Sequence, residues 1–130
     1  MMRLTVPPIE ASPTEIKLHQ LSRILEIAFD DGKVFELPCE YLRVYTPSAE
    51  AVGHGPGQEV LQVGKENVNI DSIKPVGNYG IAPHFSDGHN TGIYTWALLY
   101  KLGTDYPLLW ETYLYELEAA GYQRQAPLHN

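Results

Sequence analysis

The stretch RILEIAFDDGKVFEL, residues 23–37, constrains the fold of this chain more than any other part of the sequence. Leu25, Ile27 and Phe29 recur at every second position, which is the period of a half-buried β-strand. Phe35 continues this apolar face after Asp-Asp-Gly, a group of residues that tolerates the positive φ of a tight turn. The stretch therefore predicts a β-hairpin.

Further strands are expected on both sides of the hairpin. Ile16 and Leu18 alternate with polar residues before it, again with a period of two. After it, the region around residues 60–86 contains two strand-like runs, EVLQVG and VNIDSIKPVGNYGIAPHF. Pro75 and Pro83 interrupt the second run, as prolines do at edge positions or bulges. Between the hairpin and this region, we expect a short helical turn over residues 38–45 and a glycine-rich loop over residues 46–58.

Two helices are expected at the C-terminal end of the domain. The first covers residues 92–102, starts near Asn90 or Thr91 and ends at Gly103. The second covers residues 105–120. The apolar residues expected to face the core from these two helices are Ile93, Trp96, Ala97, Tyr100, Trp110, Tyr113, Leu114 and Leu117. The predicted fold class is α+β: antiparallel strands, with the two C-terminal helices packed against them.

Length and composition indicate one ordinary globular domain. A chain of 130 residues matches the common domain size. We expect an extended lead-in over residues 1–13, a single domain over residues 14–121 and a frayed tail over residues 122–130. The nine basic residues are scattered and the net charge is −7, which argues against a nucleic-acid partner. No apolar run approaches the roughly 20 residues that cross a bilayer, so no membrane partner is expected.

The single cysteine and the glycine-rich loop carry weak signals. Cys39 cannot form an internal disulfide, which fits the reducing environment of the cytoplasm. No cysteine-enzyme signature surrounds it, and we expect a small buried hydrophobe. The loop GHGPGQ lacks the Lys and Ser or Thr of a phosphate-binding loop, and Glu59 would repel phosphate. No catalytic residue is therefore assigned.

The five histidines form no preformed metal motif. No HxxxH, HExxH or CxxC pair is present, and HFSD has one residue too many for the HxD of iron oxygenases. His89 follows Asp87 and Gly88 in a turn, where it could be a ligand or a hydrogen-bonded turn residue. We expect His89 to be exposed at a helix N-terminus, within an interaction surface formed by Asp87, Gly88, His89, Asn90 and Thr91.

Two stretches resemble a known family. LPCEYLRVYTPSAEAVGHGPGQ and VGNYGIAPHFSDGHNTGIYTWALLYKLG are similar to the γ-butyrobetaine hydroxylase N-terminal-like domain family, over about residues 16–103. In this family, the domain occurs alone in bacteria and at the N-terminus of γ-butyrobetaine and trimethyllysine hydroxylases. It also forms the C-terminal domain of some Mrp-like P-loop ATPases that carry iron–sulfur clusters.

The resemblance also implies a position for a metal. In the hydroxylases, three cysteines and the histidine of DGH hold zinc, and these positions fall on Thr46, Ser48, Ala51 and His89. Because hydroxyl and methyl groups do not replace thiolates, we expect no structural Cys₃His zinc site. A weaker zinc or iron site formed by His89 with His54 or Asp87 remains open.

The resemblance is compatible with three functions. The leading interpretation is a non-catalytic accessory or interaction domain, linked to iron or iron–sulfur protein maturation, with an iron–sulfur carrier ATPase as partner. The first alternative is a domain that assists a separate 2-oxoglutarate-dependent oxygenase, because the chain has no room for that enzyme's barrel. The second is a weakly metal-binding protein, or a metal-dependent enzyme, that uses His54, Asp87 and His89.

Overall fold

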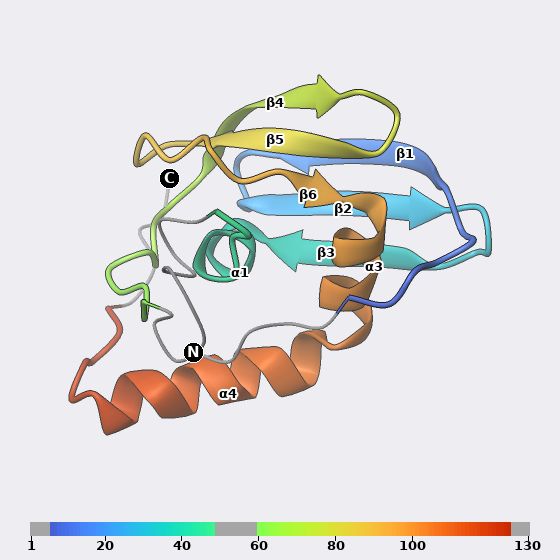
Figure 1. The fold of residues 1–130 in the computed structure, drawn as a ribbon. Helices are drawn as coiled ribbons and strands as arrows, with labels where there is room; N and C mark the ends of the chain where they lie inside the picture. Colours follow the sequence, from blue (N-terminus) through green and yellow to red (C-terminus); the bar gives the residue numbers. More distant parts are fainter. Residues whose placement is uncertain (1–5, 49–59, 126–130) are drawn as a thin grey trace.

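The computed structural model describes residues 6–48 and 60–125, which form two three-stranded antiparallel sheets and a set of helices (Figure 1). The sheet orders are β1-β2-β3 and β4-β5-β6. The predicted α+β class is confirmed. In chain order the elements are β1 (Pro13–His19), β2 (Ile24–Phe29), β3 (Val34–Pro38), α1 (Cys39–Val44), β4 (Ile70–Val76), β5 (Gly80–Phe85), β6 (Tyr94–Thr95), α3 (Trp96–Thr104) and α4 (Tyr106–Ala119).

The hairpin that the sequence predicts is formed by β2 and β3. Leu25 lies opposite Leu37, and Ile27 lies opposite Phe35, so the apolar faces of the two strands coincide. At the turn, Gly32 takes a φ of 89°, and the N–H of Phe29 donates to the carbonyl of Lys33 at 2.8 Å. The side chains of β2 that face the core are buried because the alternation places all of them on one side of the sheet.

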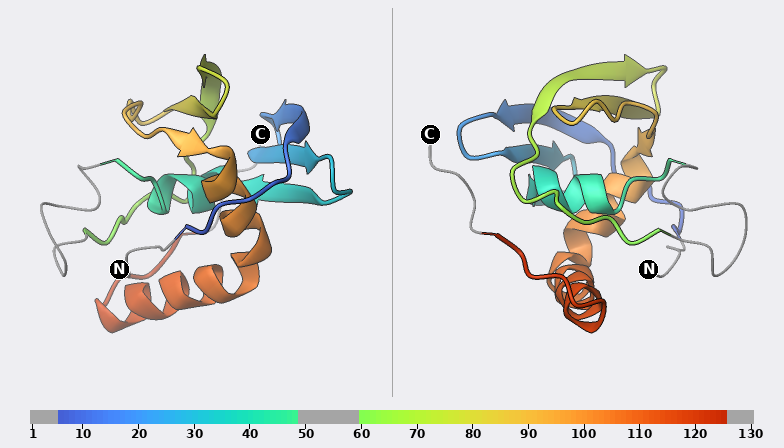
Figure 2. Two further views of the ribbon diagram at one scale, coloured as in Figure 1. Left: turned by 45° about the vertical axis from the view of Figure 1, so that its right-hand side comes forward. Right: turned by 90° about the vertical axis from the view of Figure 1, so that its left-hand side faces the viewer.

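Helix α1 occupies the centre of the molecule, between the β4-β5-β6 sheet and α4 (Figures 1 and 2). All six of its residues are buried. Buried tyrosines tie α1 to the elements around it, because each hydroxyl donates to a main-chain carbonyl. Tyr41 donates to Leu102 of α3, Tyr45 donates to Leu109 of α4, and Tyr94 of β6 donates to Leu42.

The first C-terminal helix starts later than predicted. Tyr94 pairs with Ile81 in the second sheet, which keeps the backbone extended as far as Thr95. The hydroxyl of Thr95 then accepts a hydrogen bond from the N–H of Leu98 at 3.1 Å and caps α3. The predicted start at Asn90 or Thr91 is therefore wrong, and Ile93 is exposed rather than buried.

Helix α3 also continues past the predicted end at Gly103. The helix ends at Thr104, and Gly103 lies inside it against the ring of Phe35. A Cβ atom at this position would lie 2.3 Å from that ring. The glycine therefore permits close packing of α3 on β3 rather than ending the helix. A second correction concerns residues 60–64, which form no strand although their sequence predicts one.

The chain ends that the structure describes contact the domain. Ile9 and Ala11 of the lead-in pack against the core. After α4, the side chain of Arg124 forms a bidentate pair with Glu40 of α1, and Tyr122 donates to Glu66 at 3.0 Å. In the described residues, none of the helices has the length and apolar character that crossing a membrane requires.

Candidate functional site

The loop that connects β5 to β6 packs against the chain that leaves α1 and brings most of the predicted site residues together. Gly88 takes a φ of 91°, and its N–H donates to the carbonyl of Phe85 at 2.9 Å. The N–H of Phe85 in turn donates to the carbonyl of His89 at 3.0 Å. These bonds close a tight turn that directs His89 back toward the end of α1. We refer to residues 86–93 as the β5–β6 loop.

Asp87 is the most strongly held side chain of this loop. Its Oδ2 atom accepts from Nε of Arg43 at 2.9 Å and from Nζ of Lys65 at 2.6 Å, and Oδ1 accepts from the N–H of His89 at 3.1 Å. The Asp87 side chain is 24% exposed, and that of Arg43 is 9% exposed. Burial alone would raise the pKa of Asp87, but the hydrogen bonds from Lys65, His89 and Arg43 outweigh it and hold the pKa at about 2.

His89 is buried, with 8% of its surface exposed. Its Nε2 atom lies 3.0 Å from the hydroxyl of Thr46, and its ring stands beside that of Phe85. The predicted exposure of His89 is therefore wrong. The prediction placed His89 at the start of a helix, whereas the turn at Gly88 folds the imidazole inward. The rest of the predicted interaction surface, Asp87, Gly88, Asn90 and Thr91, is exposed.

Two further contacts fix the second half of the loop. The hydroxyls of Ser48 and Thr91 lie 2.7 Å apart, and the N–H of Ser48 donates to the hydroxyl of Thr46 at 3.4 Å. Gly92 lies so close to Thr46 that an added Cβ atom would be 2.4 Å from its hydroxyl. The loop therefore fits against the end of α1 only because position 92 carries no side chain.

Three of the four positions that the resemblance assigns to zinc ligands meet here. Thr46, Ser48 and His89 are connected through hydrogen bonds in which hydroxyls take part instead of thiolates. This donor set does not fit a Cys₃His zinc ion. In residues 6–48 and 60–125, no group of three His, Cys, Asp or Glu side chains has a metal-binding arrangement. Ala51 and His54 lie outside the described residues, so the hypothesis that includes His54 stays a prediction.

Arg43 and Lys65 belong to the site, although no sequence pattern predicts a role for them. Arg43 lies in the run YLR and has only the weak signal of a charged residue within an otherwise apolar helix. Lys65 lies 22 positions before Asp87, and no local pattern connects the two. Lys65 reaches Asp87 only because the segment before β4 lies beside the β5–β6 loop in the folded chain.

Cys39 behaves as the sequence predicts. Its side chain is fully buried, and the thiol lies 3.9 Å from Oδ1 of Asn69. Burial is the main effect on its pKa and raises it to about 11. A thiol with this pKa stays protonated near neutral pH, so Cys39 is a packing residue rather than a nucleophile.

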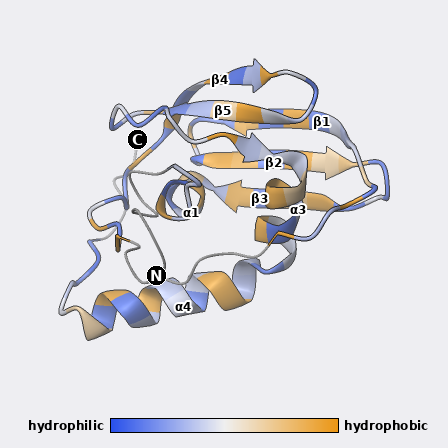
Figure 3. Cartoon of the chain, in the orientation of Figure 1, coloured by the Kyte–Doolittle hydropathy of each residue, from blue (hydrophilic) through white to orange (hydrophobic). Residues whose placement is uncertain are grey.

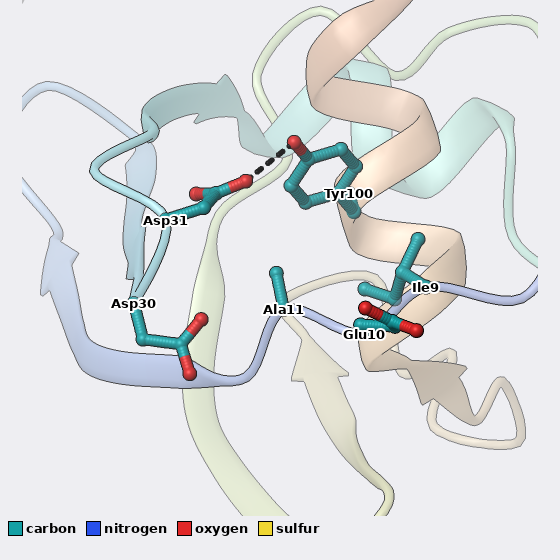
Figure 4. A pocket seen from close by; sticks show the side chains of 6 residues that line it. All are labelled: Ile9, Glu10, Ala11, Asp30, Asp31 and Tyr100. Atoms are coloured by element: carbon teal, nitrogen blue, oxygen red, sulfur yellow. Dashed lines mark hydrogen bonds between the residues drawn. The ribbon is translucent and has the colours of Figure 1, made fainter.

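A second region is an open cavity of about 550 Å³ between the lead-in and the β2–β3 turn (Figure 4). Three acidic residues line it: Glu10, Asp30 and Asp31. The hydroxyl of Tyr100 donates to Asp31 at 2.6 Å, and this bond is the main cause of the lowered pKa of Asp31. The cavity is acidic and wide, and its polar groups do not converge on one point in the way those around Asp87 do.

The fold and the loop together define a small α+β domain whose polar loop is fixed by internal hydrogen bonds. The model of the family described as "Gamma-butyrobetaine hydroxylase-like, N-terminal" matches residues 16–100. The chain belongs to this family, which confirms the resemblance seen in the sequence. Among curated proteins, none matches the chain.

Solved structures support the fold over almost the whole chain. One NMR solution structure is 47% identical, with a TM-score of 0.80, and the match covers 98% of this chain and 95% of the other. A second NMR solution structure is 43% identical, with a TM-score of 0.77 and coverage of 88% and 90%. A crystal structure from Acidithiobacillus ferrooxidans is 42% identical, with a TM-score of 0.60 and coverage of 71% and 92%. That protein has unknown function and belongs to the DUF971 family.

Proposed function

We propose that this protein is a non-catalytic interaction domain that binds a protein partner through the exposed rim of the β5–β6 loop. The rim consists of Asp87, Gly88, Asn90 and Thr91. The observation that carries the proposal is the anchoring of this rim from below by the pairs Arg43–Asp87 and Thr46–His89. A surface that is fixed before binding loses less conformational entropy when a partner docks.

The chemistry of the loop supports a binding role over a catalytic one. A carboxylate with a pKa of about 2 is a weak base near neutral pH, and Asp87 is already paired with two cations. The imidazole of His89 is buried against Thr46, where a substrate has poor access. The two groups most suited to acid–base catalysis are thus used to hold the loop in place.

The partner we favour is an iron–sulfur carrier ATPase of the Mrp-like class, with a role in iron or iron–sulfur protein maturation in the cytoplasm. The support is the resemblance: in some relatives the same domain is fused to such an ATPase. Domains that are fused in one protein often act together when they are separate.

A second candidate partner is a separate 2-oxoglutarate-dependent oxygenase. The family description, which refers to γ-butyrobetaine hydroxylase, favours this candidate. A third candidate function is weak zinc or iron binding by His54, Asp87 and His89. It is disfavoured by the pairing of Asp87 with Arg43 and Lys65, because a metal would have to displace both cations.

The test is calorimetric titration of the protein with the ATPase and with the oxygenase of its own organism. Asn90→Arg places a bulky charge on the rim, and Asn78→Arg places the same residue on the β4–β5 turn as a matched control. Asn90 and Asn78 are both exposed. We expect Asn90→Arg to weaken binding by about tenfold or more and Asn78→Arg to leave it unchanged. Equal effects of the two substitutions, or no binding to either partner, would contradict the proposal.

A further inference from the structure

Helix α4 has a second apolar face that does not contribute to the core. Leu108 is 65% exposed and Tyr115 is 71% exposed, although both are large hydrophobic residues. Leu108, Glu111, Tyr115 and Glu118 follow one another at spacings of three and four, so they lie on one side of the helix. All four are exposed. We call these four residues the outer face of α4.

The inner face of the same helix already accounts for its packing. Leu109, Tyr113 and Leu117 are buried in the core, and they lie on the side of the helix opposite to Leu108 and Tyr115. Figure 3 shows hydrophobic and hydrophilic residues alternating along α4, which lies at one edge of the molecule. The exposed apolar residues are therefore not needed to attach α4 to the domain.

The charge of α4 has one sign. Its sequence, YPLLWETYLYELEA, contains three glutamates and no basic residue, and the last turn has no lysine or arginine. Carboxylates near a helix C-terminus are repelled by the negative end of the helix dipole. Glu118 lies in the last turn, where this repulsion acts, and Glu111 lies in the middle of the helix. Within residues 6–48 and 60–125, neither of them forms an ion pair. Cations supplied by a binding partner would offset the repulsion between Glu118 and the negative end of the helix dipole.

We propose that the outer face of α4 binds a basic amphipathic helix of another protein. Apolar side chains of that helix cover Leu108 and Tyr115, and its lysines or arginines pair with Glu111 and Glu118. The glutamates disfavour a second copy of this chain, because two such faces would repel each other. The same glutamates disfavour anionic membranes and nucleic acids.

This surface is distinct from the rim of the β5–β6 loop. Helix α4 lies on the other side of α1 from the β4-β5-β6 sheet (Figures 1 and 2). The proposal therefore goes beyond the proposed function and can fail or succeed without it. A partner that used both surfaces would have to wrap around the domain.

The probe for the test is a fluorescently labelled peptide of about 18 residues, or five helical turns, with leucine and lysine at helical spacing. A peptide of the same pattern with glutamate in place of lysine is the reference. The first variant is Leu108→Ser/Tyr115→Ser and the second is Glu111→Gln/Glu118→Gln. The control, Glu36→Gln/Asp71→Asn, removes the same charge from exposed positions elsewhere. Circular dichroism confirms that each variant is folded before anisotropy is measured.

We expect the leucine–lysine peptide to bind, the glutamate peptide not to bind, and each α4 variant to lose about tenfold in affinity. The control variant should stay within about twofold of the natural protein. A control that loses as much as Glu111→Gln/Glu118→Gln would show attraction to net charge alone and overturn the proposal. Unchanged binding by Leu108→Ser/Tyr115→Ser would do the same. A dimer that is detected by sedimentation and abolished by Leu108→Ser/Tyr115→Ser would also overturn the proposal, because a second copy of this chain would then cover the outer face of α4.

Discussion

The hydroxyl of Thr46 lies 3.0 Å from Nε2 of His89, although the two residues are 43 positions apart in the chain. This contact joins the end of α1 to the β5–β6 loop, and both residues are buried. The resemblance seen in the sequence assigns zinc ligands to both of these positions. In this chain, the hydrogen bonds Thr46–His89 and Ser48–Thr91 hold the β5–β6 loop against the end of α1.

The Thr46–His89 contact should make the two residues energetically coupled. Thr46→Val keeps the shape of the side chain but leaves Nε2 of His89 without this partner, which should cost about 1–3 kcal/mol of unfolding free energy. His89→Ala should cost a similar amount. In urea unfolding, the double variant should be less destabilised than the sum of the single variants by more than about 0.5 kcal/mol. Thr112→Val, on the surface of α4, is the control. Strict additivity would show that the contact carries no energy.

Asp87 should contribute to stability in a pH-dependent way. Its pKa of about 2 in the folded protein lies below the ordinary 3.8. The pairing therefore stabilises the fold fully above about pH 5, and its contribution is lost as the pH falls through 4 toward 2. Near pH 7, Asp87→Asn should destabilise the protein by about 1 kcal/mol in urea unfolding, because solvent screens this partly exposed pairing, and the difference should shrink below pH 4. A difference that stays constant between pH 7 and pH 2.5 would refute the role of the ionised carboxylate.

The sequence predicts the parts of this fold that depend on local pattern. The β2–β3 hairpin follows from the alternation of Leu25, Ile27 and Phe29 and from the turn residues, all of which lie close together in the chain. The burial of Cys39 follows from its apolar neighbourhood. These features need no knowledge of distant contacts, which is why periodicity alone is sufficient.

The sequence predictions that are wrong concern features that depend on contacts between distant segments of the chain. The start of α3 is set by the pairing of Tyr94 with Ile81, and no helix signal near Asn90 reveals it. His89 is buried because Thr46 is present on the other side, and Asp87 is neutralised by Lys65 from a third segment. The local pattern predicted an interaction surface in the β5–β6 loop. It could not show which side of the loop faces solvent.

Gly103 should be intolerant of even the smallest side chain. A Cβ atom there would lie 2.3 Å from the ring of Phe35, so Gly103→Ala must displace α3 from β3. Although alanine favours helices, the overpacking should destabilise the protein by about 1–3 kcal/mol. Gly121→Ala is the comparison, because Gly121 has a φ of 78° and open space around it. Any loss of stability at position 121 would therefore come from backbone strain and not from overpacking. Gly103→Ala combined with Phe35→Leu should recover part of the loss. No recovery would show that the ring is not the obstacle.

Removal of metal should leave the fold intact. Thr46 and Ser48 are hydroxyl residues that already hydrogen-bond within the loop, and they do not replace thiolates as structural zinc ligands. Thermal unfolding of protein purified without an affinity tag should give the same midpoint with and without EDTA. A fall of many degrees on chelation would reveal a structural metal, since such metals contribute directly to folding.

Hydrogen–deuterium exchange can locate the partner-binding surface, which we propose to be the rim of the β5–β6 loop. Exchange is measured for the protein alone and after addition of the iron–sulfur carrier ATPase or the oxygenase. We expect amides of residues 86–93 to exchange more slowly with one of these partners, while those of the β4–β5 turn do not change. This result would support the proposal that the rim binds a partner. Protection that is confined to other segments, or absent with both partners, would contradict it.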